Sequence, residues 1–202
     1  MDNEMESNKR DHKVEITDIA ISKVPYVRYR EIPEEYYETL HQIAIAVLEY
    51  SKSRNDSNET AITYSLDEDI PEGEMSLAVA YGDEHSVDPL NNADAYHMLA
   101  TAESCVIVIV HNHPSTSKVS LSDAGFLFRY KAVKMVVVVT NPGSINYIVK
   151  TDYYDREQAV KLFREAVHKI DNMQNLKQKQ DATDYFLNNC YKAGLIFEDG
   201  RR

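Results

Sequence analysis

The hydrophobic positions along the chain follow two spacings, one typical of amphipathic helices and one typical of strands. Apolar positions three and four apart predict helices over 33–50, 92–103, 120–130, 154–170 and around 186–191. Alternating or continuous apolar positions predict strands over 59–66, 75–81, 105–110, 135–140 and 145–150. Because helices and strands alternate along the chain, we expect an α/β fold in which helices flank a mixed central β-sheet.

The strand predicted over 105–110 differs from the others, because every position from Cys105 to Val110 is apolar. This pattern is typical of a strand that is covered on both faces and lies near the centre of its sheet. The strand leads directly into His111 and His113. We therefore expect polar, chemically useful side chains at an inner position of the sheet edge.

The two ends of the chain differ in pattern from its middle. Residues 1–31 are predicted to form a polar tail and an extended arm, in which Pro25 disfavours a central strand. Residues 32–171 carry the main α/β domain, and residues 172–202 are predicted to form a polar linker, 172–182, and a C-terminal helix. No apolar segment typical of a secretory signal is present near Met1, so we expect a cytoplasmic protein.

Composition and charge exclude several classes of partner. A chain of 202 residues with 43% hydrophobic and 27% charged residues suits one folded domain. No apolar run approaches the roughly 20 residues that span a bilayer, so no membrane partner is expected. The net charge of −11 repels phosphate backbones, so no nucleic-acid partner is expected either. Two cysteines far apart in the sequence, Cys105 and Cys190, predict reduced core residues rather than a disulfide framework.

A candidate metal site follows the buried strand. Residues two apart in an extended segment face the same side, so His111 and His113 can present both imidazoles to one point. A helix that begins near Ser120 places Asp123 on the face that the connection from Pro114 to Val119 can fold back over the histidines. Two imidazoles and one carboxylate suit Zn²⁺, and three protein ligands leave a position for water. The sequence therefore predicts a catalytic zinc site.

Hydrolysis at such a site needs a general base that is not a metal ligand. Glu59 fits best, because it begins a strand on its more polar face; Glu72, Glu84 and Glu103 are the competing carboxylates. The hydroxyl of Ser120 could stabilise an oxyanion. A structural alternative for Ser120 and Asp123 is a helix capping box, and the two interpretations are compatible. His85 is expected to be a loop histidine.

The set His111-x-His113, Ser120-x-x-Asp123 with Glu59 upstream resembles the JAMM motif of the JAB1/MPN metalloprotease family. RadC-like proteins of that family share the run His-Asn-His-Pro-Ser found here. The resemblance covers about 33–150, and the spacer from Pro114 to Val119 is one residue shorter than is usual in the family. It implies a JAB1/MPN-like, cytidine-deaminase-like three-layer domain.

The resemblance also implies an activity. His111, His113 and Asp123 would bind zinc, Glu59 would be the base, and Ser120 would contact the oxyanion or the water. The expected reaction is hydrolysis of a peptide or isopeptide bond, with a protein or peptide substrate for which a ubiquitin-like protein is one candidate. Two alternatives stay open: a noncatalytic MPN-type interaction module, and a RadC-like or HNH-type DNA-associated protein, which the acidic charge disfavours.

Overall fold

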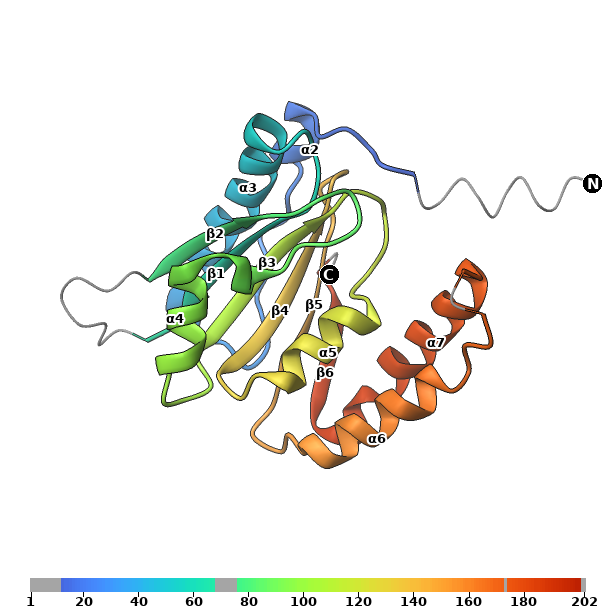
Figure 1. Cartoon of the computed structure of the whole chain (residues 1–202). Helices are drawn as coiled ribbons and strands as arrows, with labels where there is room; N and C mark the ends of the chain where they lie inside the picture. Colours follow the sequence, from blue (N-terminus) through green and yellow to red (C-terminus); the bar gives the residue numbers. More distant parts are fainter. Residues whose placement is uncertain (1–11, 68–75, 173, 201–202) are drawn as a thin grey trace, which may run out of the picture.

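The computed structural model describes residues 12–67, 76–172 and 174–200, and these residues form one six-stranded sheet between helices (Figure 1). The strand order is β2-β1-β3-β4-β5-β6, and β3 and β4 are parallel while all other neighbours are antiparallel. The strands are β1 (Thr60–Ser65), β2 (Leu77–Tyr81), β3 (Ile107–His113), β4 (Val133–Thr140), β5 (Ile145–Lys150) and β6 (Leu195–Asp199). The predicted mixed sheet flanked by helices is confirmed.

Helices cover both faces of this sheet (Figure 1). One core contains residues of α3 (Tyr37–Arg54), whose short neighbour α2 (Asp18–Ser22) lies beside it. The other core contains residues of α4 (Ala93–Thr101), α5 (Leu121–Arg129), α6 (Arg156–Val167) and α7 (Leu176–Asn189). Single turns of 3₁₀-helix lie at η2 (Glu34–Tyr36), η3 (Pro89–Asn91) and η4 (Cys190–Ala193). None of the helices in the described part of the chain is long and apolar enough to cross a bilayer.

Strand β3 lies inside the sheet, as the continuous apolar run predicts. Ile107 and Ile109 belong to the core under α5, whereas Val108 and Val110 belong to the core under α3. Because side chains alternate along a strand, His111 and His113 continue the α5 side of β3 and the residue between them continues the α3 side. The two sides of one strand end therefore face different environments.

The N-terminal arm packs against the same core as α3. Ile16, Val24, Val27 and Tyr29 are buried, and the Tyr29 ring meets the Tyr147 ring edge to face with centroids 5.0 Å apart. The arm contains the helix α2 and forms no strand between residues 12 and 32. This agrees with a wrapping arm rather than an edge strand, because Pro25 and the short α2 interrupt any ladder.

The C-terminal segment departs from the predicted linker and helix. Helix α7 begins at Leu176, within the predicted linker, and β6 extends the sheet by pairing antiparallel with β5. Gly194 precedes β6 in the left-handed region at φ 68°, and a Cβ there would lie 2.3 Å from the carbonyl oxygen of Tyr153. Strand β6 is not predicted by the sequence pattern, because its five residues at the sheet edge show no clear alternation and their partner β5 lies far away in the sequence.

Candidate metal centre

Two imidazoles meet at the end of β3. His111 and His113 both lie within the strand, and their side chains point to the same side because they are two residues apart. Their Nε2 atoms are 3.0 Å apart, and the residues are 4% and 6% exposed. The predicted pair therefore forms, and it is almost completely shielded from solvent.

The first turn of α5 adds a carboxylate to this pair. Oδ1 of Asp123 lies 3.2 Å from Nε2 of His111, and Oδ2 lies 3.4 Å from Nε2 of His113. One ligand atom from each of the three residues lies within 4.8 Å of the others. The structure thus brings together the three side chains that the sequence predicts as metal ligands, from β3 and α5.

Ser120 and Asp123 form a helix capping box as well. The Ser120 hydroxyl accepts the Asp123 amide at 3.2 Å, while the Ser120 amide and hydroxyl both donate to Oδ2 of Asp123 at 2.7 Å. Oδ2 is therefore satisfied by Ser120, and Oδ1 is directed at His111. The capping box is therefore present, and it is compatible with the ligand prediction, because Oδ1 makes no bond to Ser120 while Oδ2 also lies 3.4 Å from Nε2 of His113.

The loop after β3 orients the second imidazole. Nδ1 of His113 lies 3.0 Å from the hydroxyl and 3.3 Å from the carbonyl oxygen of Ser117. In the tautomer whose Nδ1–H donates to that carbonyl, Nε2 carries the lone pair that a metal needs. Such a bond to the distal nitrogen is the usual support of a histidine that binds a metal.

The chemistry of the donor set suits Zn²⁺. Ligand atoms of a tetrahedral zinc site lie about 3.3 Å apart when each binds the ion at about 2.0 Å. The two Nε2 atoms lie 3.0 Å apart, and the contacts of Asp123 are 3.2 Å from Oδ1 to His111 and 3.4 Å from Oδ2 to His113. One ligand atom from each of the three residues lies within 4.8 Å of the others. Two neutral imidazoles and one carboxylate make the three-ligand set of a catalytic site rather than the four-ligand set of a structural one.

Electrostatic coupling within the cluster is strong. Burial alone would raise the pKa of Asp123, but His111 and His113 outweigh it and hold the pKa well below the ordinary value. Burial lowers the pKa of His113, yet the hydrogen bond and the charge of Asp123 outweigh burial and raise it. The cluster therefore attracts positive charge, in the form of protons or of a cation.

Glu59 lies next to this cluster, immediately before β1. It lines the same pocket as His111 and Asp123 and is 9% exposed. Burial raises the pKa of its carboxyl, the two histidines lower it, and the raising effect prevails. Among its competitors, Glu84 and Glu103 are exposed and do not line the pocket, and Glu72 lies outside the described residues. His85 is an exposed loop residue, as expected.

The backbone of Glu59 is fixed from two directions. Its amide donates to the carbonyl of Asp83 at 2.8 Å, and its carbonyl accepts the amide of Gly82 at 2.8 Å and the side-chain amide of Asn55 at 2.8 Å. These bonds tie the start of β1 to the segment after β2. The carboxylate is therefore presented from a rigid backbone rather than from a mobile loop.

Asn112, between the two histidines, was not singled out from the sequence. Its side chain is fully buried on the α3 side, where Oδ1 accepts the amide of Thr60 at 2.7 Å. Nδ2 lies 3.1 Å from the carbonyl of Asn58, 2.7 Å from Oδ1 of Asn141 and 3.2 Å from the hydroxyl of Ser51. Asn112 thus holds the residues on both sides of Glu59. The sequence does contain one sign of this role: Asn112 is a polar residue at an inner position of a buried strand, where its side chain requires hydrogen-bond partners.

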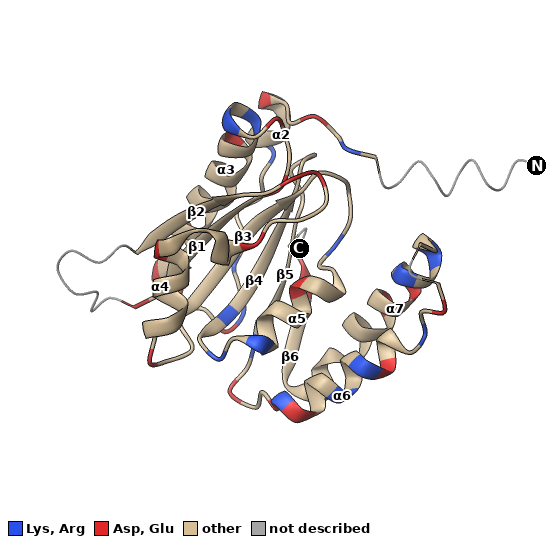
Figure 2. Cartoon of the chain, viewed as in Figure 1, with Lys and Arg blue, Asp and Glu red and all other residues tan. Residues whose placement is uncertain are grey.

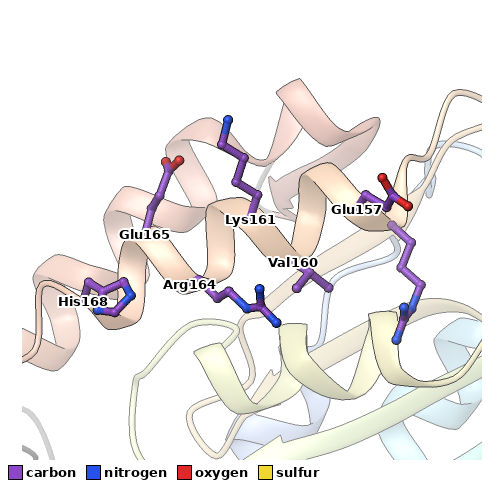
Figure 3. Close-up of a pocket in the computed structure, with 7 residues that line it drawn as sticks. Glu157, Val160, Lys161, Arg164, Glu165 and His168 are labelled. Carbon is purple, nitrogen blue, oxygen red and sulfur yellow. The ribbon is translucent and has the colours of Figure 1, made fainter.

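A second hollow, of about 350 Å³, lies on α6 away from these ligands. Figure 3 shows Lys161 and Glu165 projecting from one side of α6 and Arg164 from the opposite side. Charged groups that diverge in this way do not form a convergent site. The cluster of His111, His113 and Asp123 is therefore the better candidate for a functional site.

Comparisons of the chain with protein-family models, with curated proteins and with solved structures give no match. What the resemblance to the JAB1/MPN family implies therefore stays a prediction. The geometry of the cluster and of Glu59 carries the functional proposal.

Proposed function

We propose that the protein is a zinc-dependent hydrolase of peptide or isopeptide bonds, built on a JAB1/MPN-like, cytidine-deaminase-like domain. The carrying observation is the convergence of His111, His113 and Asp123, whose ligand atoms lie within 4.8 Å of one another, beside the buried carboxylate of Glu59. The pocket that Glu59, His111 and Asp123 line together would also give a substrate access to the cluster.

Each side chain has a defined role in this proposal. His111, His113 and Asp123 hold the metal, and bound zinc would lower the pKa of a water molecule from about 15.7 to about 7 and polarise the scissile carbonyl. Glu59 accepts the proton of the attacking water and passes it to the leaving amine. Burial favours this role, because a raised carboxyl pKa makes proton transfer in both directions easier.

Ser120 orients the carboxylate of Asp123, and we propose that it also contacts the oxyanion directly. Its hydroxyl and amide hold Oδ2 of Asp123, which orients the carboxylate toward the histidines. To stabilise an oxyanion, the hydroxyl proton must turn away from Asp123, whose Oδ2 retains the amide of Ser120. We propose that it does so when substrate enters.

The substrate class follows from the chemistry of the site and from the charge of the molecule. Lys and Arg lie on several separate elements rather than along one surface, which gives nucleic acid no continuous basic track (Figure 2). We propose a protein or peptide substrate, with a ubiquitin-like protein as one candidate, and a cytoplasmic location that suits two unpaired cysteines.

The noncatalytic interaction module is the second candidate. A pure binding module has no need of a buried base, whereas Glu59 is held by a rigid backbone beside three intact ligand side chains. An HNH-type nuclease is disfavoured further, because both histidines lie within a central strand and the net charge is −11. The hydrolase therefore remains the function that the geometry supports best.

The test is hydrolysis by zinc-loaded protein of a quenched fluorescent peptide library and of isopeptide-linked ubiquitin dimers. We expect cleavage by the wild type and a loss of at least about 100-fold in Glu59→Gln, because general-base catalysis contributes roughly 10² to 10⁴. The matched control is Glu84→Gln, an exposed glutamate outside the pocket, which should cleave like the wild type. Folded, zinc-bound protein that cleaves none of these substrates would favour the interaction module.

A further inference from the structure

A groove of about 170 Å³ leads away from the candidate metal centre. Its floor comes from the sheet, through Ala61, Ile109 and Val136, and its walls come from α5 and from the segment around η3. The lining between the two ends of the groove is mostly apolar. Because a cavity of about 150 Å³ holds a benzene ring, this groove has room for one large apolar side chain.

The groove runs along α5, from the proposed metal ligand Asp123 at the start of the helix to Arg129 at its end. Asp123 in the first turn, Phe126 and Tyr130 all line it, and the last two rings pack with centroids 4.7 Å apart. The last residue of α5, Arg129, lines it too. With a rise of about 1.5 Å per residue, Arg129 lies about 9 Å along the helix from Asp123. In Figure 2 the acidic and basic segments of α5 lie at opposite ends of the helix.

The charges at the two ends of the groove differ. Arg129 is the one cationic side chain in the described lining, and no carboxylate of the described residues forms an ion pair with it. Of the acidic groups that line the groove, Glu59 and Asp123 belong to the candidate centre. Asp88 is engaged locally, since its carboxylate accepts the amide of Leu90 at 3.0 Å. Among the described residues, Arg129 thus has no ion-pair partner at the far end of the groove.

We propose that this groove binds the substrate next to the scissile bond and selects an apolar side chain followed by a carboxylate that pairs with Arg129. An extended peptide advances about 3.3 Å per residue, so about 9 Å places the carboxylate within about three residues of the bond. The apolar side chain contacts Ile109, Val136 and Phe126. This inference rests on the proposed function, since it names the substrate preference of the same site.

The substrate carboxylate that pairs with Arg129 can belong to a chain terminus or to an Asp or Glu side chain. Binding experiments distinguish these two sources. The probe is an N-acetylated tetrapeptide with leucine at its second position, prepared as the free acid, as the C-terminal amide, and as the amide with a final Asp. Calorimetric titration uses zinc-loaded Glu59→Gln protein, in which turnover does not interfere. Glu59→Gln removes a charge from the metal end of the groove and leaves Arg129 in place.

We expect the two carboxylate peptides to bind about tenfold more tightly than the plain amide, as one charge-assisted hydrogen bond to Arg129 provides. Preference for the free acid alone would identify a terminal carboxylate as the source. Arg129→Gln should reduce the ratio to about one, whereas the control Arg164→Gln, an exposed arginine on α6, should preserve it. Replacing the leucine of the probe by serine should weaken binding about tenfold, because the burial of the apolar side chain against the groove is lost.

The failures of the two proposals are distinguishable. Equal binding of acid and amide peptides, or a ratio that Arg129→Gln leaves unchanged, would overturn the groove assignment whether or not the wild type hydrolyses peptides. Selective binding that depends on Arg129, together with no hydrolysis by the zinc-loaded wild type, would support the groove and overturn the proposed reaction.

Discussion

The end of β3 presents two clusters of polar side chains, one on each side of the strand. On the α5 side, His111 and His113 meet the carboxylate of Asp123. On the α3 side, Asn112 meets Asn141, whose Nδ2 donates to the carbonyls of Val14 and Ser57 at 2.7 and 2.9 Å. Both clusters are buried, yet their hydrogen-bond balance differs.

The asparagine cluster is satisfied by the protein itself, since each amide group finds donors or acceptors in the backbone or in the other amide. The histidine cluster brings two Nε2 atoms to 3.0 Å of each other beside a single carboxylate. The Nε2–H of one ring can donate to the other ring, and the same nitrogen and carboxylate oxygen atoms can also serve as ligands of a cation. The asparagine side of the strand thus stabilises the fold and positions the backbone around Glu59, while the histidine side is the one that we propose binds a metal.

The largest expected effect concerns the histidine cluster. His113→Ala should weaken zinc binding by more than about 100-fold, because a two-ligand site remains, and hydrolysis should be lost with the metal. Calorimetric zinc titration measures the affinity. His85→Ala, which removes an exposed loop histidine, is the matched control and should bind zinc like the wild type. Undiminished affinity in His113→Ala would place the metal elsewhere.

Removal of Asn112 should act on stability instead. Asn112→Ala leaves the amide of Thr60, the carbonyl of Asn58 and Oδ1 of Asn141 without this partner, so the free energy of unfolding should fall by about 2–4 kcal/mol. Urea denaturation measures it. The control Asn188→Ala, at an exposed position of α7, should change it by less than about 0.5 kcal/mol. A similarly small change in Asn112→Ala would show that the network does not stabilise the fold.

The histidine cluster should also make the metal-free protein sensitive to pH. The pKa of folded His113 is raised above 6.5, so its stabilising effect is complete below pH 6.5 and is lost as the pH rises through the raised pKa. The pKa of Asp123 is lowered, so its effect is present above pH 3.8 and is lost as the pH falls further. Denaturation of metal-free protein should therefore show maximal stability from this pair between these values.

Bound zinc should reverse the dependence of stability on pH above pH 6.5. Because zinc binds deprotonated imidazoles, the stability of the zinc-loaded protein should rise with pH over the range in which that of the metal-free protein falls. Metal-free His113→Gln should lack the decline above pH 6.5. A decline that persists in this variant would assign the titration to another group.

The smallest expected effect concerns the cap of α5. Ser120→Ala removes the hydroxyl that accepts the Asp123 amide, and it should lower the melting temperature in proportion to a loss of about 1 kcal/mol. Ser120→Thr keeps a hydroxyl and should retain most of the stability. An equal loss in both variants would mean that packing around Ser120, rather than its hydrogen bonds, stabilises the helix start.

The sequence predicted the candidate ligands because their signals are local. The spacing of His111 and His113 along a strand, and the position of Asp123 in a helix start, follow from backbone geometry alone. Glu59 needed the expectation of a neighbouring strand, and the structure places it beside the cluster. The central position of β3 followed from its unbroken apolar run.

Other features depend on partners that are distant in the sequence. The network of Asn112 joins residues from the arm, α3, β1 and the turn after β4, so no short window of sequence contains it. Strand β6 exists because β5 offers a free edge to it. The groove along α5 is formed by three strands and two helical segments, and its single cation, Arg129, becomes meaningful only when they are assembled.

The most direct test of the central claim is the zinc content per chain, measured by elemental analysis after dialysis in buffer that supplies zinc. We predict close to one zinc per chain in the wild type and in Glu59→Gln, and little in His113→Ala, with all three proteins folded by circular dichroism. This result would establish a three-ligand site with Glu59 outside the metal's coordination. Folded wild-type protein that retains no zinc under these conditions would contradict the account.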